Sequence, residues 1–132
     1  MLKITQVDHL GIRISDIARS RAFYERLGFA VVRDAGYDQG HPVVMVHSSG
    51  VVVNLLGPST AEKDTNVLMD VADKYSGYTH AALRVESMDE TVAALGEMGI
   101  AITGGPAPFE KRDRSQFLQR LDEIVQGIRR KQ

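Results

Sequence analysis

The stretch VDHLGIRI at residues 7–14 decides the fold, because YTHAALRV at residues 78–85 repeats it 71 positions later. The two copies stay in register without a gap over residues 7–32 and 78–103. Identical residues coincide along the repeat: His9 with His80, Arg13 with Arg84, Ala22 with Ala93, Gly28 with Gly99, and Ala30 with Ala101. Two units that pair about a pseudo-twofold axis would bring the two histidines together. The repeat therefore predicts a site at which His9 and His80 converge.

Composition limits the kind of protein and the kind of site. The 132 residues are 43% hydrophobic, enough for one compact domain or two small fused units. A formal net charge of -1 gives no basic field for nucleic acid or an anionic membrane, so the expected partner is a small molecule or another protein. The chain has no cysteine, so any metal would need histidine and oxygen ligands.

Targeting signals are not apparent in the sequence. The start, MLKITQVDHL, lacks the apolar run of a signal peptide. No apolar stretch approaches the roughly 20 residues of a membrane-spanning helix. We therefore expect a cytoplasmic protein.

The order of predicted elements is the same at the start of each copy. Residues 7–14 alternate as a strand, and a helix follows over residues 17–27, capped by Ser15 or Asp16 and ended by Gly28. In the second copy Ser87 and Glu90 form a capping box ahead of a helix that ends at Gly99. The two helices match end to end.

Three short strands are expected after the first helix, at residues 29–35, 42–48 and 51–56. We divide the single domain 1–132 into a first module (about 4–57), a linker (about 58–77), a second module (about 78–110) and a tail helix (about 113–130).

Several motifs resemble the vicinal oxygen chelate superfamily, which includes glyoxalase I, bleomycin and fosfomycin resistance proteins and extradiol dioxygenases. They are DHLGIRISD, AFYERLGF, VVVNLLG, YTHAALRVES and MGIAITGGP, and the likeness covers about residues 4–108. The resemblance implies an α+β fold of two βαβββ modules that form a curled mixed sheet around a cleft. It implies function less strongly, because one fold hosts many chemistries.

Metal-dependent members of that superfamily take their ligands from the first and last strands of each module. Carried onto this sequence, the first-strand ligands are His9 and His80, and the cofactor is a divalent Ni, Zn, Mn or Fe ion. The last strand of the first module offers Asn54 where the superfamily usually has Glu or Gln. An amide oxygen is a neutral, weaker donor than a carboxylate. The resemblance therefore leaves open whether this chain holds a metal at all.

The end of the second module departs further from the superfamily pattern. In KRDRSQFLQRLDEIVQGIRRKQ, apolar residues follow the stripe of an amphipathic helix: Phe117, Leu118, Leu121, Ile124, Val125 and Ile128. We favour a tail helix over the alternative, a last hairpin that puts Gln126 or Glu123 near the fourth ligand position, because that hairpin would have poor turn chemistry. With a tail helix, the segment 100–109 is left as a sheet edge, which favours a homodimer.

Three functions remain open. The first is a glyoxalase-like lyase or isomerase whose metal holds the neighbouring oxygens of a small molecule. The second is a metal-free binding protein of the bleomycin-resistance type, and the third is a non-catalytic dimerising module. Arg13 and Arg84 share the histidine face of their strands, so they are candidates for binding an anionic substrate group, or for pairing with carboxylates at the rim.

Overall fold

The computed structural model describes residues 1–60, 67–68 and 71–102. The chain forms two compact units, Met1–Lys63 and Asp64–Gln132. The boundary between them falls inside the segment predicted to be a linker. The predicted tail helix at about 113–130, with Glu123 and Gln126, lies outside the described residues, as does most of the segment 100–109.

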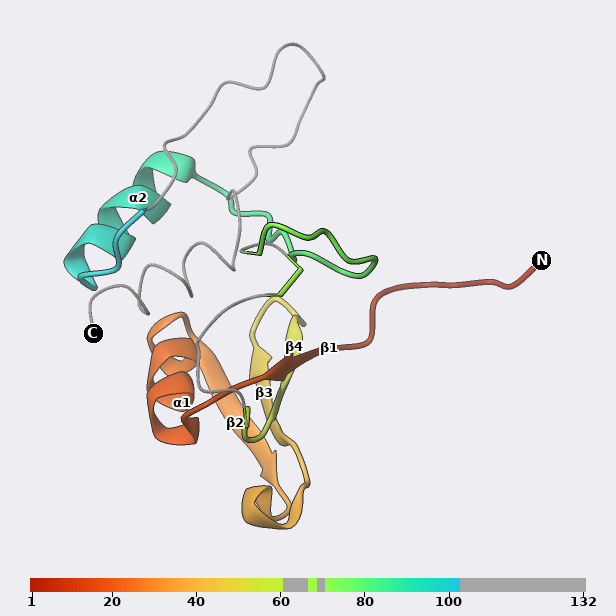
Figure 1. Cartoon of the computed structure of the whole chain (residues 1–132). Helices are drawn as coiled ribbons and strands as arrows, with labels where there is room; N and C mark the ends of the chain where they lie inside the picture. The colour runs from red at the N-terminus through yellow and green to blue at the C-terminus, as the bar shows by residue number, and fades with distance from the viewer. Residues whose placement is uncertain (61–66, 69–70, 103–132) are drawn as a thin grey trace. The chain divides into compact units, whose positions relative to one another are not determined.

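The first unit contains a four-stranded mixed sheet (Figure 1). Its elements are β1 (Leu10–Arg13), α1 (Ile17–Arg26), β2 (Phe29–Asp34), the short 3-10 helix η1 (Tyr37–Gln39), β3 (Val43–His47) and β4 (Val52–Leu56). The strand order is β1-β4-β3-β2, with β1 parallel to β4 and the other neighbours antiparallel. The α+β class and the predicted order strand, helix, strand, strand, strand are confirmed.

Alternate residues of β3 and β4 build the core of the first unit. Val43, Met45, Val53 and Leu55 are almost completely buried, whereas the residues between them are only half-buried. Such alternation places one face of the strands in the core and the other face outside it. The core also takes in Phe23 and Tyr24 of α1 and Phe29 of β2, whose rings meet edge to face.

Local signals at both ends explain why α1 forms where it does. The carboxylate of Asp16 accepts a hydrogen bond from the backbone N–H of Arg19 at 2.9 Å, which identifies Asp16 and not Ser15 as the N-cap. Gly28 ends the helix with a φ of 92°, a backbone conformation that favours glycine.

The first strand is shorter than its sequence pattern indicates. Alternation predicts a strand from Val7, yet β1 begins at Leu10, and residues 1–9 have no assigned secondary structure. The reason is pairing: β1 is hydrogen-bonded along β4, whose residues Val53–Leu56 lie opposite Leu10–Arg13. No strand of the described residues continues beside Val7.

The second unit repeats the helix but not the strand. Helix α2 (Met88–Glu97) is capped by Ser87, whose hydroxyl accepts from the backbone N–H of Glu90 at 3.3 Å, and Gly99 follows with a φ of 68°. Residues 78–85 show strand-like alternation of burial, but only an isolated β-bridge at Arg84. In the described residues no helix is long and apolar enough to cross a membrane.

Candidate functional site

His9 lies immediately before β1 and is oriented by the preceding residue. Its Nδ1 lies 2.7 Å from Oδ2 of Asp8, and the imidazole is about half exposed, at 47%. An ionised carboxylate can only accept, so Nδ1 must be the donor. The neutral ring then has its lone pair on Nε2, the nitrogen that remains available to a ligand.

His80 has a matching local arrangement in the second unit. Its Nδ1 lies 2.8 Å from the Oγ1 of Thr79. Asp8 and Thr79 occupy equivalent positions of the repeat, each directly before its histidine. Both histidines therefore engage Nδ1 locally. The Thr79 hydroxyl can donate or accept, so its contact orients the His80 ring without fixing which nitrogen carries the proton. The repeat could have identified Asp8 and Thr79 from sequence, because they are the residues adjacent to the two matched histidines.

Asn54 lies in the middle of the sheet, on the face away from the core. It is opposite Gly11 of β1 on one side and Val44 of β3 on the other. Gly11 carries no side chain, and a Cβ atom at this position would meet Cδ1 of Leu56 at 3.4 Å. The Oδ1 atom of Asn54 is buried and has no hydrogen-bond partner among the described residues. A buried acceptor of this kind is costly unless a donor or a cation satisfies it.

Arg13 lies at the other end of β1, where it contacts the exit of β4. Its Nη1 donates to the backbone oxygen of Gly57 at 2.9 Å. The ring of Tyr37 packs so closely on Gly57 that a Cβ atom there would overlap it. Burial and the nearby carboxylate of Asp38 raise the pKa of Tyr37, and Arg13 opposes this rise. Arg13 thus holds the β1 and β4 ends together, and part of its guanidinium is already used.

The remaining predicted site residues lie elsewhere in the chain. His80 and Arg84 belong to the second unit, so their convergence with His9 and Arg13 stays a prediction. Gln126 lies outside the described residues. Within the described ranges, no three His, Asp or Glu side chains are grouped so that they could hold a metal ion.

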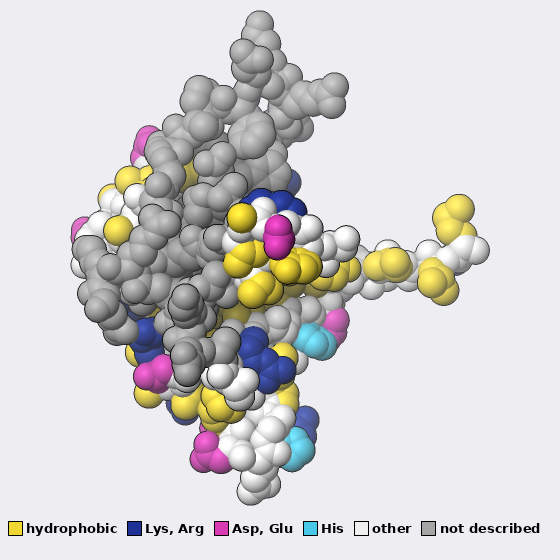
Figure 2. Space-filling model, viewed as in Figure 1, with side chains coloured by type: hydrophobic (Ala, Val, Ile, Leu, Met, Phe, Trp, Pro, Cys, Tyr) yellow, Lys and Arg dark blue, Asp and Glu magenta, His cyan; other side chains and the backbone are white. Residues whose placement is uncertain are grey.

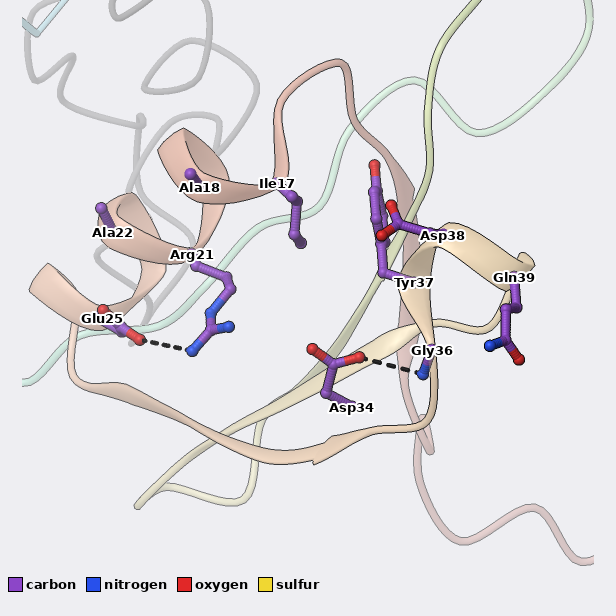
Figure 3. A pocket seen from close by; sticks show the side chains of 10 residues that line it. All are labelled: Ile17, Ala18, Arg21, Ala22, Glu25, Asp34, Gly36, Tyr37, Asp38 and Gln39. Carbon is purple, nitrogen blue, oxygen red and sulfur yellow. Dashed lines mark hydrogen bonds and ion pairs between the residues drawn. The ribbon is translucent and has the colours of Figure 1, made fainter.

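A separate surface cleft of about 570 Å³ lies between α1 and the loop that carries η1 (Figure 3). Its polar groups are partly engaged: Asp34 accepts from the backbone N–H of Gly36 at 3.2 Å, and Arg21 lies 3.8 Å from Glu25. Asp34 is opposite Val43, whereas Asn54 is opposite the next residue, Val44. Successive strand residues point to opposite faces, so this cleft is not on the face of Asn54.

Solved structures similar to this chain share its fold. A glyoxalase/dioxygenase from Nostoc punctiforme is 22% identical, with a TM-score of 0.59, over 79% of this chain and 77% of that one. A glyoxalase family protein from Bacillus cereus is 20% identical, with a TM-score of 0.55, over 83% of this chain and 82% of that one.

Two curated relatives are named UPF0178 proteins, a name that states no activity. One from Rhodospirillum rubrum is 48% identical over 44 residues, which are 33% of this chain and 29% of that protein. Another, from Aliivibrio fischeri, is 28% identical over 125 residues, covering 94% of this chain and 79% of that protein. The chain thus spans less than a third of the Rhodospirillum relative and most of the Aliivibrio relative.

The family match covers most of the sequence. The Glyoxalase/Bleomycin resistance protein/Dioxygenase superfamily matches residues 6–119, which include His9, His80, Asn54, α1 and α2. The chain belongs to the Glyoxalase/Bleomycin resistance protein/Dioxygenase superfamily.

Proposed function

We propose that this chain is a glyoxalase-like enzyme that uses a divalent metal to bind two neighbouring oxygens of a small molecule. The proposal rests on one observation: the imidazoles of His9 and His80, at equivalent positions of the repeat, make equivalent side-chain contacts. His9 and His80 each engage Nδ1 with the preceding side chain, at 2.7 Å and 2.8 Å. Equivalent positions of a duplicated unit thus hold their imidazoles through the same ring nitrogen.

The donor chemistry of the first unit fits a metal ligand. A histidine that binds a metal usually donates its other ring N–H to a carboxylate or another acceptor, which fixes the tautomer and raises the basicity of the ligating nitrogen. The Asp8–His9 pair has this form. Asn54 adds a buried oxygen that has no hydrogen-bond partner in the described part of the chain, and a cation would satisfy it. His9 and His80 are the proposed strong ligands, and Asn54 and Gln126 the proposed weak ones.

The proposed ligands would hold a metal that supplies Lewis-acid chemistry for negative charge on the substrate's oxygens. The other roles fall to the chain itself. Asp8 and Thr79 orient the two imidazoles. Half-buried valines of β3 and β4 flank Asn54 and reduce the access of water to that face, which strengthens polar contacts made there. Arg13 and Arg84 are the proposed contacts for an anionic substrate group.

A metal-free binding protein of the bleomycin-resistance type is the second candidate, and Asn54 is the observation that favours it. No carboxylate stands at this position of β4, and the buried Oδ1 of Asn54 can accept from an N–H or O–H group of a ligand as well as bind a cation. In either case we propose a cytoplasmic homodimer that acts on a small molecule.

Metal binding to histidine variants separates the two candidates. The chain has four histidines, so His9→Ala and His80→Ala can be compared with His41→Ala and His47→Ala as matched controls. Calorimetric titration of the full chain with Ni²⁺ or Zn²⁺ should give stoichiometric binding that weakens at least about a hundredfold in the first two variants. The two controls should bind as the wild type does.

Two outcomes would count against the metalloenzyme. Wild-type protein that binds neither ion would favour the metal-free binding protein. Binding that survives both the His9 and the His80 substitution would place the metal elsewhere and remove the two histidines from the site.

A further inference from the structure

The loop that carries η1 has one large apolar side chain with which to anchor itself. Residues 35–41 read AGYDQGH, and Tyr37 is half-buried, whereas Asp38, Gln39 and Gly40 are exposed. In Figure 2 this end of the first unit, at the bottom of the view, consists mainly of backbone and of side chains that are neither charged nor hydrophobic. Burial of apolar surface is the main favourable term that can hold such a loop in place. The position of the loop therefore depends on what Tyr37 contacts.

The hydrogen bonds that the structure describes for this loop are all made within it or with the adjacent residue of β2. The backbone N–H groups of Gln39 and His41 donate to the oxygen of Gly36 at 3.0 and 3.2 Å, and the N–H of Gly36 donates to Asp34. Such bonds shape the loop without fixing it to the rest of the sheet. Gly36 and Gly40 have φ values of 108° and 87°, which residues with a Cβ atom rarely adopt, so the chain bends at a glycine on both sides of η1.

Tyr37 places its ring on Gly57, directly after β4. The ring occupies the space that a Cβ atom of residue 57 would need. Gly57 does not have the positive φ that requires a glycine at other positions of this chain. Space and not backbone conformation is therefore the reason for a glycine here, and any larger residue would displace the ring.

Hydrogen bonds to β1 hold Gly57 in place. Nη1 of Arg13 donates to the oxygen of Gly57 at 2.9 Å. On either side of Gly57, the N–H of Ile14 donates to Leu56 at 2.9 Å, and the N–H of Ser59 donates to Ile14 at 2.7 Å. The chain after β4 is thus fixed to β1 on both sides of the position that the ring contacts.

We propose that Tyr37 and Gly57 form a steric latch, which holds the η1 loop against the end of β4. Residues 36–39 of the loop form one wall of the cleft of about 570 Å³, and α1 forms the opposite wall (Figure 3). The latch sets the distance between these walls, and release of the ring lets the loop move on its two flanking glycines. Every residue of the latch lies in the first unit, so the latch is independent of the second unit and of the proposed metal site.

The ring of Tyr37, and not its hydroxyl, makes the latch. The hydroxyl oxygen is buried and has no hydrogen-bond partner among the described residues. A buried hydroxyl without a partner costs free energy and adds no attachment. A phenylalanine at this position should therefore hold the loop as well as the tyrosine does.

Amide hydrogen exchange of residues 36–41, measured by NMR on the full chain, tests the latch. Gly57→Ala puts a methyl group where the ring lies, so exchange in the loop should become faster by at least about tenfold, while amides in the centre of β3 keep their rates. Gly11→Ala is the matched control, because it adds the same methyl group to the neighbouring strand, where a Cβ atom would meet only Leu56, at 3.4 Å. It should leave loop exchange within about twofold of the wild type.

Variants of Tyr37 keep the test decisive even if Gly57→Ala does not fold. Tyr37→Ala removes the ring without any overlap and should also speed loop exchange by at least about tenfold, whereas Tyr37→Phe should leave it within about twofold. The double variant Gly57→Ala/Tyr37→Ala should exchange no faster than Tyr37→Ala, because the added methyl group then meets no ring.

Three results would overturn the latch. The first is loop exchange at the wild-type rate in Tyr37→Ala or in a folded Gly57→Ala. The second is a double variant in which the two effects add, since residues that act through one contact cannot be independent. The third is equal acceleration in Tyr37→Phe and Tyr37→Ala, which would assign the attachment to the hydroxyl.

Discussion

The two copies of the repeat begin with similar sequences but differ in structure. In the first unit, residues 10–13 form β1 beside β4, whereas in the second unit residues 78–85 contain only an isolated β-bridge at Arg84. Both segments alternate half-buried and exposed residues. The two helices, by contrast, are both ten residues long and have side-chain caps at equivalent places.

The difference shows which sequence signals are sufficient on their own. A helix closes its hydrogen bonds within one segment, so caps and periodicity predict both α1 and α2. A strand needs a partner, and β4 supplies one to β1, whereas no strand of the described residues in the second unit is assigned beside residues 78–85. Alternation thus indicates which face of a segment is apolar, but pairing decides whether it becomes a strand.

The largest expected effect is a loss of stability on changing the core of the first unit, and it tests whether this unit contributes most of the free energy of unfolding. Leu55 is fully buried in β4, opposite Ile12 and Val43, so Leu55→Ala should lower the free energy of unfolding by about 2–5 kcal/mol. The matched change Leu83→Ala, at a half-buried position of the second unit, should cost about 1 kcal/mol. Urea denaturation followed by circular dichroism measures both. Equal losses of unfolding free energy in the two variants would contradict the claim that the first unit contributes more to stability than the second.

The second expected effect is a loss of stability at high pH caused by Tyr24, in the core of the first unit. Burial raises its pKa to about 12, so above pH 10 the unfolded chain loses the phenolic proton before the folded chain does. The free energy of unfolding should therefore fall by about 2–3 kcal/mol between pH 10 and pH 12. Tyr24→Phe should abolish most of that decrease in the free energy of unfolding. Tyr78→Phe, at an exposed position, should leave the pH dependence of stability unchanged. If the loss of stability between pH 10 and pH 12 persists in Tyr24→Phe, another group causes it.

The smallest expected effect concerns the side-chain N-caps of α1 and α2, which the two units share. Asp16→Ala and Ser87→Ala each remove one side-chain cap, and each should cost about 1 kcal/mol. Ser15→Ala, next to the first cap, should change stability by less than about 0.5 kcal/mol. Thermal unfolding of the three variants measures these costs. A loss at one helix cap without a loss at the other would show that the repeated helices are not equivalent.

Much of the first unit could be predicted from sequence. Periodicity, a cap at Ser15 or Asp16, and Gly28 located α1, and turn residues separated β2, β3 and β4 at nearly their observed positions. The start of β1 was wrong by three residues, since alternation continues through Val7 where hydrogen bonding does not. Tertiary pairing is not encoded in the alternation of a single segment.

The candidate site could be predicted only in part. The repeat identified His9 and His80, and the family pattern identified Asn54. The role of Asp8 and Thr79 depends on the rotamers of adjacent side chains, which the residue pattern does not specify. The position of Asn54, whose Oδ1 has no hydrogen-bond partner within the residues that the structure describes, follows from the register of β1, β4 and β3, which is likewise a property of the folded sheet.

Nitrogen NMR of the histidine rings during a Zn²⁺ titration tests the central claim most directly. We predict that Nε2 of His9 and Nε2 of His80 shift together and reach saturation at the same metal equivalent, while His41 and His47 do not respond. Separate saturation of the two rings, or a response that involves Nδ1 of His9, would contradict a shared site built from the duplicated unit.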